Sequence, residues 1–285
     1  MLKERNKPLQ WLRASLYGHL SLWMRSIRTI LMAVFILLMT YMLVRSMENS
    51  TSVNNFSVHL GETMFVYTNT GFNMLMTSVA FMVMMSELPK RVSYQNYAAM
   101  RLSRIRWLVS LVIFCVGIVF IFTVLMLVTT ALFSLPFVTP GGDWSDLERL
   151  AADKNYAHEM QFVPKYIRVL SPTTACALAV FILYLFWLTM ALLILMFSLW
   201  GMPNFGVVFC VSLLLLNITI LFESLPGIKL PSNFATLSAI TSQVYEHKFR
   251  YVAQVIVGYF MLDTLLLALM TMRVKRMDIR YIEKE

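Results

Sequence analysis

Six long apolar blocks dominate this 285-residue chain and restrict what it can fold into. Each is close to the ~20 residues that an α-helix needs to cross a bilayer. None has the alternation of a membrane β-barrel strand, and backbone polar groups in lipid must pair within their own segment. The sequence therefore predicts an all-α polytopic membrane protein with six transmembrane helices, forming one domain over residues 1–285. The blocks are Thr29–Val44, Met64–Met85, Trp107–Leu135, Pro172–Trp200, Phe205–Phe222 and Tyr251–Met272.

The composition excludes several other classes of protein. Only 14% of the residues are charged and 59% are hydrophobic, whereas soluble proteins carry about 25% charged residues. A soluble enzyme or a disordered chain is therefore excluded. The three cysteines all lie inside apolar blocks, and they show neither a disulfide framework nor metal-ligand spacing.

The distribution of Lys and Arg predicts the orientation. The N-terminal stretch, residues 86–106 and the C-terminal tail hold sixteen of them, and the alternate connections hold eight together with nine carboxylates. By the positive-inside rule both termini lie in the cytoplasm. The net charge of +9 thus follows the membrane topology, and we expect no nucleic-acid partner. We expect a multi-pass protein in the plasma (cytoplasmic) membrane of a bacterium, in contact with membrane lipids.

Residues Pro8–Ser26 read as an amphipathic helix before the first block. Apolar residues recur there at spacings of three or four, and polar residues such as His19 lie mostly off that stripe. This pattern predicts an interfacial helix on the inner leaflet; the alternative is a cytoplasmic helix packed on another subunit. The stripe consists of Leu9, Leu12, Leu16, Leu20, Trp23 and Ile27.

Residues 86–106 form the first long cytoplasmic connection. Pro89 prevents a simple continuation of the second block, and Ser93 can cap a short helix. Tyrosine and arginine are enriched at protein interfaces, so we interpret this connection as a docking helix; the alternative is that its arginines only anchor lipid headgroups. The residues concerned are Ser93, Tyr94, Tyr97, Arg101, Arg104 and Arg106.

Residues 223–250 differ from an ordinary outer loop because they are apolar. Pro226, Gly227 and Pro231 interrupt them, and Ser232 can cap a short helix. Non-helical backbone at membrane depth is tolerated where it packs against protein. We expect this segment to enter the outer leaflet as a re-entrant element.

The chain lacks the motifs of the common catalytic centres. It has no GxxxxGK[ST] phosphate loop, no HExxH pair and no glycine-flanked serine elbow, so we expect a protein that is not an enzyme.

Two polar features do lie in the apolar blocks. Asn69, Asn73 and Thr77 form a stripe at helical spacing in the second block, which either bonds helices together or lines a pathway.

Asp263 is the only acidic residue well inside any block. A charged carboxylate at the bilayer centre costs ~2.5–3.5 kcal/mol on insertion scales, so it must face protein or water. We expect Tyr259, one turn earlier, or an asparagine of the second block to hydrogen-bond it. A clamp between helices and a role in a transport pathway are both open at this point.

The whole pattern resembles the membrane subunit of type-2 ATP-binding-cassette exporters. The resemblance lies in the six blocks, the N-terminal amphipathic helix, the basic first connection and the broken apolar segment before the last block. The most specific stretch is Glu87-Leu-Pro-Lys-Arg-Val-Ser-Tyr-Gln-Asn-Tyr, continuing to Arg101-Leu-Ser-Arg-Ile-Arg-Trp107, and the basic ending Arg273-Val-Lys-Arg-Met-Asp278 is also similar.

The resemblance implies a division of labour between chains. A separate ATPase subunit would bind ATP and Mg²⁺, so this chain would hold no cofactor, and a second permease copy, identical or related, would complete the pathway. The coupling helix would be Ser93–Met100, preceded by the acidic Glu87, the elbow helix Pro8–Ser26 and the outer half-helices Pro226–His247. Pathway residues would be Asn69, Asn73 and Thr77, with Ser212 and Asn217 opposite. The cargo would be amphipathic or hydrophobic.

Two other classes of function remain open at the level of the sequence. An ion-coupled secondary transporter would normally use discontinuous spans and several intramembrane charges, whereas the blocks offer only Asp263. A non-transporting membrane anchor or sensor would recruit a cytoplasmic partner through residues 86–106.

Overall fold

A computed structural model of the chain describes residues 7–54, 58–69, 71–86, 103–139, 141, 143–145, 170–221 and 250–276. These residues are mostly helical, as the apolar blocks predict. The helices are α1 (Lys7–Met24), α2 (Ile27–Asn54), α3 (Leu60–Asn69), α4 (Gly71–Met85), α6 (Arg104–Ser134), α8 (Pro172–Leu199), α9 (Pro203–Leu221) and α12 (Arg250–Arg276).

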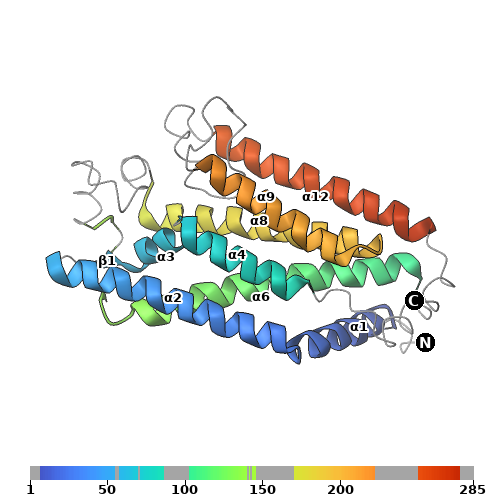
Figure 1. Cartoon of the computed structure of the whole chain (residues 1–285), viewed down its shortest axis with the longest axis horizontal. Helices are drawn as coiled ribbons and strands as arrows, with labels where there is room; N and C mark the ends of the chain where they lie inside the picture. Colours follow the sequence, from blue (N-terminus) through green and yellow to red (C-terminus); the bar gives the residue numbers. More distant parts are fainter. Residues whose placement is uncertain are drawn as a thin grey trace.

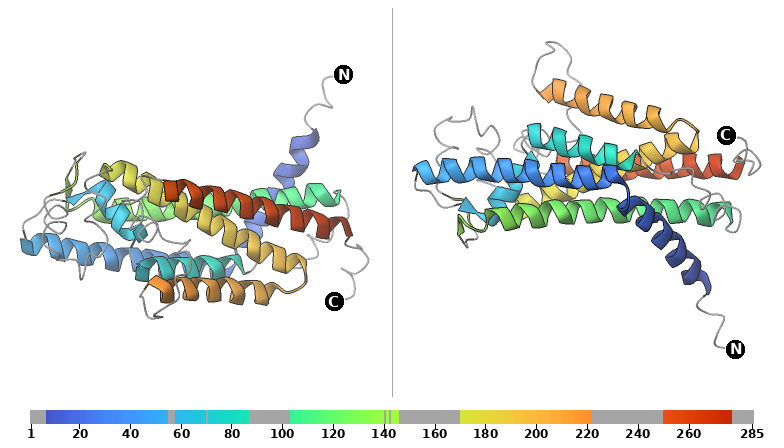
Figure 2. Two further views of the ribbon diagram at one scale, coloured as in Figure 1. Left: turned by 90° about the horizontal axis from the view of Figure 1, so that it is seen from above. Right: turned by 60° about the horizontal axis from the view of Figure 1, so that its bottom comes forward.

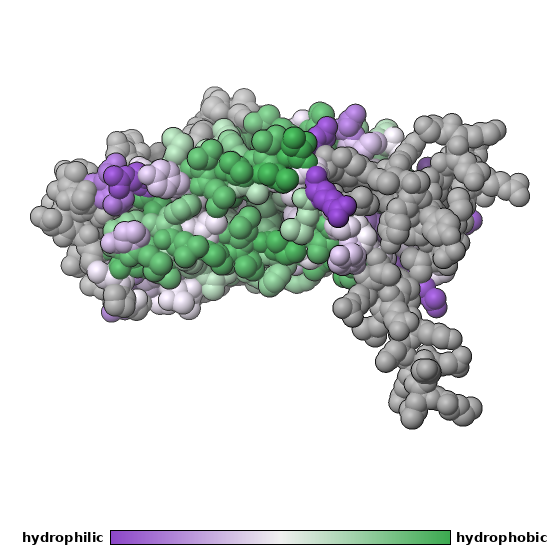
Figure 3. Space-filling model, turned by 90° about the horizontal axis from the view of Figure 1, so that it is seen from below, coloured by the Kyte–Doolittle hydropathy of each residue, from purple (hydrophilic) through white to green (hydrophobic). Residues whose placement is uncertain are grey.

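Four of these helices are long and apolar enough to cross a membrane, namely α2, α6, α8 and α12. Two further apolar stretches, Asn73–Met85 in α4 and Pro203–Leu215 in α9, are shorter. Figure 3 shows a broad band of apolar side chains around the middle of the molecule, with hydrophilic residues gathered toward its two ends. The length of the helices and this band fit a membrane-embedded protein.

From α2 onward the helices lie side by side, and when α3 and α4 are taken as one passage, successive passages run in opposite directions (Figure 1). At one end, the Arg28 side chain donates to Ser86 Oγ at 3.5 Å, and Arg104 donates to the Lys275 carbonyl at 2.9 Å. We name this the basic end. At the opposite end, which we name the far end, α3 and α8 begin and α6 finishes. The start of α1 and the end of α12 both lie toward the basic end (Figure 1).

Helix α8 is the centre of the bundle. It contacts α3, α4 and α6 on the N-terminal side of the sequence and α9 and α12 on the C-terminal side. Of its most apolar stretch 72% is buried, compared with 22% for α2. Because α8 contains no charged residue, it can be surrounded on all sides by other apolar helices.

The second apolar block does not form the single helix expected for Met64–Met85. Helix α3 ends at Asn69 and a separate helix, α4, begins at Gly71 (Figure 1). Asn, Thr and Gly are poor helix formers, and they occur consecutively at this junction. The expected polar stripe is consequently divided between two helices, with Asn69 ending one and Asn73 and Thr77 in the other.

A short pair of parallel strands at the far end departs from the all-α prediction. Strand β1 (Val58–His59) pairs with β2 (Val138–Thr139), with Val58 opposite Val138 and His59 opposite Thr139. The pairing joins the start of α3 to the end of α6. It satisfies backbone groups that the ends of both helices leave free.

Helix α1 leaves the bundle obliquely at the basic end (Figure 2). It packs on the first turns of α6, where Ser15 Oγ donates to Ser110 Oγ at 3.1 Å and the His19 ring lies 5.3 Å from the Phe114 ring. Leu16 and Leu20 pack against the core, and Trp23 is buried within it. The buried face also includes His19, which the sequence placed off the apolar stripe. Whether α1 lies at the lipid interface stays a prediction.

Candidate functional site

Asp263 lies in the middle of α12 and faces α8. Its side chain is 7% exposed, and its Oδ1 lies 2.7 Å from Oγ1 of Thr189, which is 2% exposed. Thr189 Oγ1 also lies 3.0 Å from the carbonyl oxygen of Leu185, one turn earlier in α8. A polar contact therefore joins the two helices at the depth where a polar group costs most in lipid.

The partner of Asp263 differs from both partners expected from the sequence. Tyr259 is buried one turn away, but its hydroxyl has no hydrogen-bond partner among the described residues. Asn73 is buried in α4, and its amide nitrogen is likewise without a partner within the described part of the chain. Thr189 was not among the expected partners, because the sequence does not show that α8 packs beside α12.

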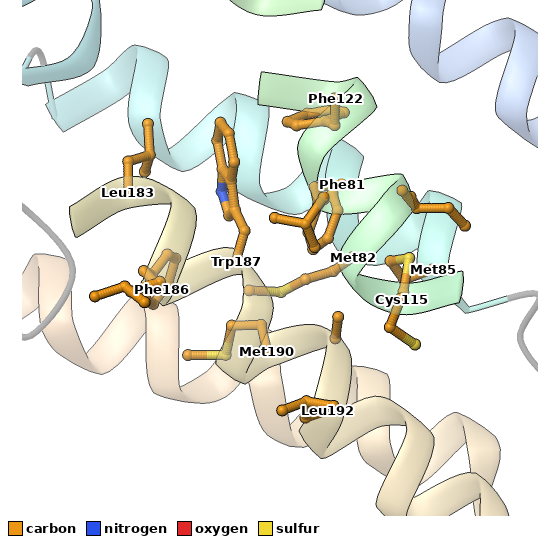
Figure 4. Packing of buried hydrophobic residues seen from close by; sticks show 14 of the residues in the cluster. Phe81, Met82, Met85, Cys115, Phe122, Leu183, Phe186, Trp187, Met190 and Leu192 are labelled. Atoms are coloured by element: carbon orange, nitrogen blue, oxygen red, sulfur yellow. The ribbon is translucent and has the colours of Figure 1, made fainter. Parts of the chain in front are cut away.

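A second polar contact lies in the densest part of the core. The indole nitrogen of Trp187 donates to Ser78 Oγ at 3.0 Å, which links α8 to α4. Figure 4 shows the Trp187 ring pointing toward Phe81 of α4 and Phe122 of α6. The ring centroids are 5.8 Å and 4.7 Å away, respectively. Both geometries are favourable for aromatic pairs, so Trp187 holds three helices together.

The pathway role expected for residues of the second and fifth blocks stays a prediction. Thr77 is buried, and its hydroxyl donates to the Asn73 carbonyl at 2.6 Å within α4. Ser212 of α9 is exposed. The side chains of Asn69 and Asn217 lie outside the described part of the structure.

The expected docking helix also lies outside the described residues, which stop at Ser86 and resume at Ser103. This applies to Glu87, Ser93, Tyr94, Tyr97 and Arg101. Both flanks of this connection are at the basic end, where Arg104 bonds to the carbonyl oxygen of Lys275 at the end of α12. The expected re-entrant segment, 223–250, lies outside the described residues apart from its last residue.

The far end contains a buried carboxylate that sequence reasoning did not single out. Glu62 in the first turn of α3 is fully buried, and it accepts the backbone N–H of His59 at 3.1 Å and that of Ser145. Trp144 stacks edge-on against Phe65 at 5.7 Å and donates its indole N–H to the Leu170 carbonyl at 2.6 Å. Glu62 therefore fastens the start of α3 to the chain that follows α6, which makes its role here structural.

The junction between α1 and α6 contains the other buried ionisable group of note. Burial lowers the pKa of His19 below its ordinary value of 6.5. Neither ring nitrogen has a hydrogen-bond partner among the described residues. A protonated imidazole is poorly accommodated there, so the docked position of α1 favours neutral His19.

No group of three or more His, Cys, Asp or Glu side chains is placed to hold a metal ion among the described residues. All three cysteines are free and buried. The polar contact between Asp263 and Thr189 is the best candidate for a functional site, because among the described residues of the apolar blocks it is where an acidic side chain bonds to another helix.

Comparisons with known proteins identify no relative. No protein-family model matches the chain, and neither the curated proteins nor the solved structures contain a match.

Proposed function

We propose that this chain is the transmembrane subunit of an ATP-binding-cassette exporter of the type-2 class. In this proposal α2, α3 with α4, α6, α8, α9 and α12 provide the six membrane crossings, and both termini lie in the cytoplasm. A separate ATPase binds ATP and Mg²⁺, and this chain itself hydrolyses no nucleotide. The membrane is the plasma membrane of a bacterium, and a second permease copy completes the pathway for an amphipathic or hydrophobic cargo.

The observation that carries the proposal is that α1, the end of α12 and the two helix ends joined by residues 87–102 all belong to the basic end. Helix α1 packs there, α12 finishes there, and residues 87–102 connect two helix ends that lie there (Figure 1). An ATPase that drives a permease needs a contact on the cytoplasmic side, and a connection between two spans at that side can transmit its movement into the bundle.

The charges of the described residues support the same orientation. None of the described Asp or Glu residues lies at the basic end, whereas the far end holds Glu48, Glu62 and Asp143. Basic loops remain on the cytoplasmic side of a membrane protein. The basic residues described at the basic end, from the α1–α2 junction, α6 and α12, are Arg25, Arg28, Arg104, Arg106, Arg273, Lys275 and Arg276.

Copurification tests the proposal directly. The full-length tagged chain is solubilised in mild detergent from its native host, and the proteins that remain bound are identified by mass spectrometry. We expect a stoichiometric ATPase with a phosphate-binding loop. Transport by the purified chain alone under an ion gradient would instead identify a secondary transporter, and a bound regulator without transport would identify an anchor or sensor.

A paired substitution tests the docking role of residues 86–106. Replacing Tyr94 and Tyr97 by Ala removes two aromatic anchors, which typically contribute ~1–4 kcal/mol each to an interface. We expect loss of ATPase binding with unchanged thermal stability of the membrane domain. Tyr17 provides the control, because it is 74% exposed on α1 and lies outside this connection. ATPase binding that survives the double substitution would refute the docking role.

A further inference from the structure

The contact between Asp263 and Thr189 requires that one of the two side chains donate a proton to the other. Thr189 Oγ1 lies 3.0 Å from the Leu185 carbonyl oxygen and 2.7 Å from Asp263 Oδ1, and both distances are those of hydrogen bonds. A hydroxyl has only one proton to donate, although it can accept two further bonds. The Leu185 carbonyl oxygen can only accept, so Thr189 alone cannot supply the protons for both contacts, and both are hydrogen bonds only if Asp263 supplies one.

Other buried threonines in the bundle donate their proton within their own helix. Thr123 and Thr130 of α6 each donate to the carbonyl one turn earlier, at 2.8 Å in both cases. This bond is a common arrangement for threonine within a helix. If Thr189 uses its proton in this way, the 2.7 Å contact is a hydrogen bond only when Asp263 supplies a second proton. An ionised carboxylate has no proton to donate, whereas a protonated carboxylic acid has one.

Among the described residues, no basic side chain forms an ion pair or hydrogen bond with Asp263 that would stabilise its charged form. Asp263 is the only Asp, Glu, Lys, Arg or His in any of the six apolar blocks. Helix α12 packs mainly on α8 and α6. In the apolar blocks of these three helices the other titratable groups are tyrosines and cysteines: Tyr184 and Cys176 in α8, Cys115 in α6, and Tyr251 and Tyr259 on α12 itself. A buried carboxylate without a cationic partner is strongly disfavoured, whereas a neutral acid with a bonded hydroxyl is compatible with the interior of the bundle.

We propose that Asp263 is a proton-binding site, occupied as a neutral carboxylic acid that donates its proton to Thr189 and so fastens α12 to α8. The inference does not depend on the proposed function, because it concerns the protonation state of one side chain. The inference also implies that loss of the Asp263 proton breaks this hydrogen bond. Removal of the proton leaves a carboxylate oxygen facing the lone pairs of Thr189, unless the hydroxyl gives up its bond to Leu185. The proton thus holds the two helices together.

Infrared spectroscopy of the full-length chain in lipid vesicles at neutral pH tests this assignment. The carbonyl stretch of a protonated acid is well separated from the stretches of a carboxylate, and it shifts in D2O. We expect the spectrum of the wild type minus that of Asp263→Asn to contain the band of a protonated acid. The subtraction cancels the other carboxyl groups of the chain. A difference that contains only carboxylate bands would overturn the proposal.

A second variant identifies the acceptor and does not require Asp263 to be changed. Thr189→Val removes the acceptor and keeps the shape of the side chain, so the acid band should shift to the higher frequency of a weaker hydrogen bond. Thr189→Ser should restore the original position. Thr130→Val is the matched control, because Thr130 is equally buried and bonds only to its own helix. A band that does not move in Thr189→Val, or that moves as far in Thr130→Val, would show that Thr189 is not the acceptor and would overturn the proposal.

Discussion

Replacing Glu62 should destabilise the far end by an amount that depends on how many acceptors remain. Glu62 accepts two backbone N–H groups, from His59 and Ser145, in a fully buried position. A buried donor that loses its partner costs ~1–3 kcal/mol. Glu62→Ala leaves both donors without a partner and should therefore cost ~2–6 kcal/mol. Glu62→Gln retains one acceptor oxygen and turns an NH2 group toward the second N–H, so it should cost about half as much.

Thermal unfolding of the detergent-solubilised protein measures this order. For a chain of this size 1 kcal/mol corresponds to a shift in Tm of roughly 2–4 °C. We therefore expect Glu62→Ala to lower the Tm by roughly 4–24 °C and Glu62→Gln to lie between Ala and the wild type. Asp143→Asn is the matched control, since this carboxyl group lies in the same region and is exposed.

Equal Tm values for Glu62→Ala and Asp143→Asn would refute the reasoning, because the two carboxylates would then contribute equally despite their different burial. A Glu62→Gln variant as stable as the wild type would refute the part that assigns both backbone N–H groups to the carboxylate.

Three further predictions follow from other parts of the structure. The pKa of His19 is lowered by burial, so as the pH falls below 6.5 the undocked form of α1 binds more protons than the docked form, and docking of α1 weakens. The accessibility of α1 to protease should therefore rise with acidity in the wild type and not in His19→Phe. Trp187→Phe should cost ~1–3 kcal/mol of stability, because it removes a hydrogen bond and leaves a cavity, whereas Trp200→Phe at a 39% exposed position should leave the Tm nearly unchanged. A cysteine introduced at Asp143 should react with an impermeant thiol reagent in intact cells, whereas a cysteine at Tyr17 should react only after permeabilisation. The background should be low because the native cysteines are buried. Labelling of Tyr17→Cys in intact cells would reverse the orientation.

The course of the helices was largely predictable, because the apolar blocks fix where a helix can exist in lipid. Residues Pro172–Trp200 became α8 at Pro172–Leu199, and Trp107–Leu135 became α6 at Arg104–Ser134. The second block was interpreted as one helix because hydropathy alone does not register the three poor helix formers Asn69, Thr70 and Gly71. The occurrence of these three residues side by side is the sequence signal for the break between α3 and α4.

Contacts between helices were beyond the reach of sequence reasoning. The sequence indicates that Asp263 faces protein or water, and in the structure it faces α8. Its partner Thr189 lies in another helix 74 residues away, and the indole of Trp187 bonds to Ser78 across 109 residues. Periodicity describes which face of a helix is polar, but it does not say which helix lies against that face. Glu62 was missed for the same reason, since Ser145 is 83 residues distant.

The central position of α8 has a consequence for biogenesis. Because the chain is synthesised from its N-terminus, α2, α3, α4 and α6 leave the ribosome before α8 exists. During that interval Ser78 lacks the indole that will bond to it, and Phe81 and Phe122 face lipid where Trp187 will later lie. The N-terminal half can form the contacts of α2 with α4 and α6 by itself, but its core lacks α8 until that helix emerges. Once α8 has emerged it joins the earlier helices together and at the same time presents the surface on which α9 and α12 assemble.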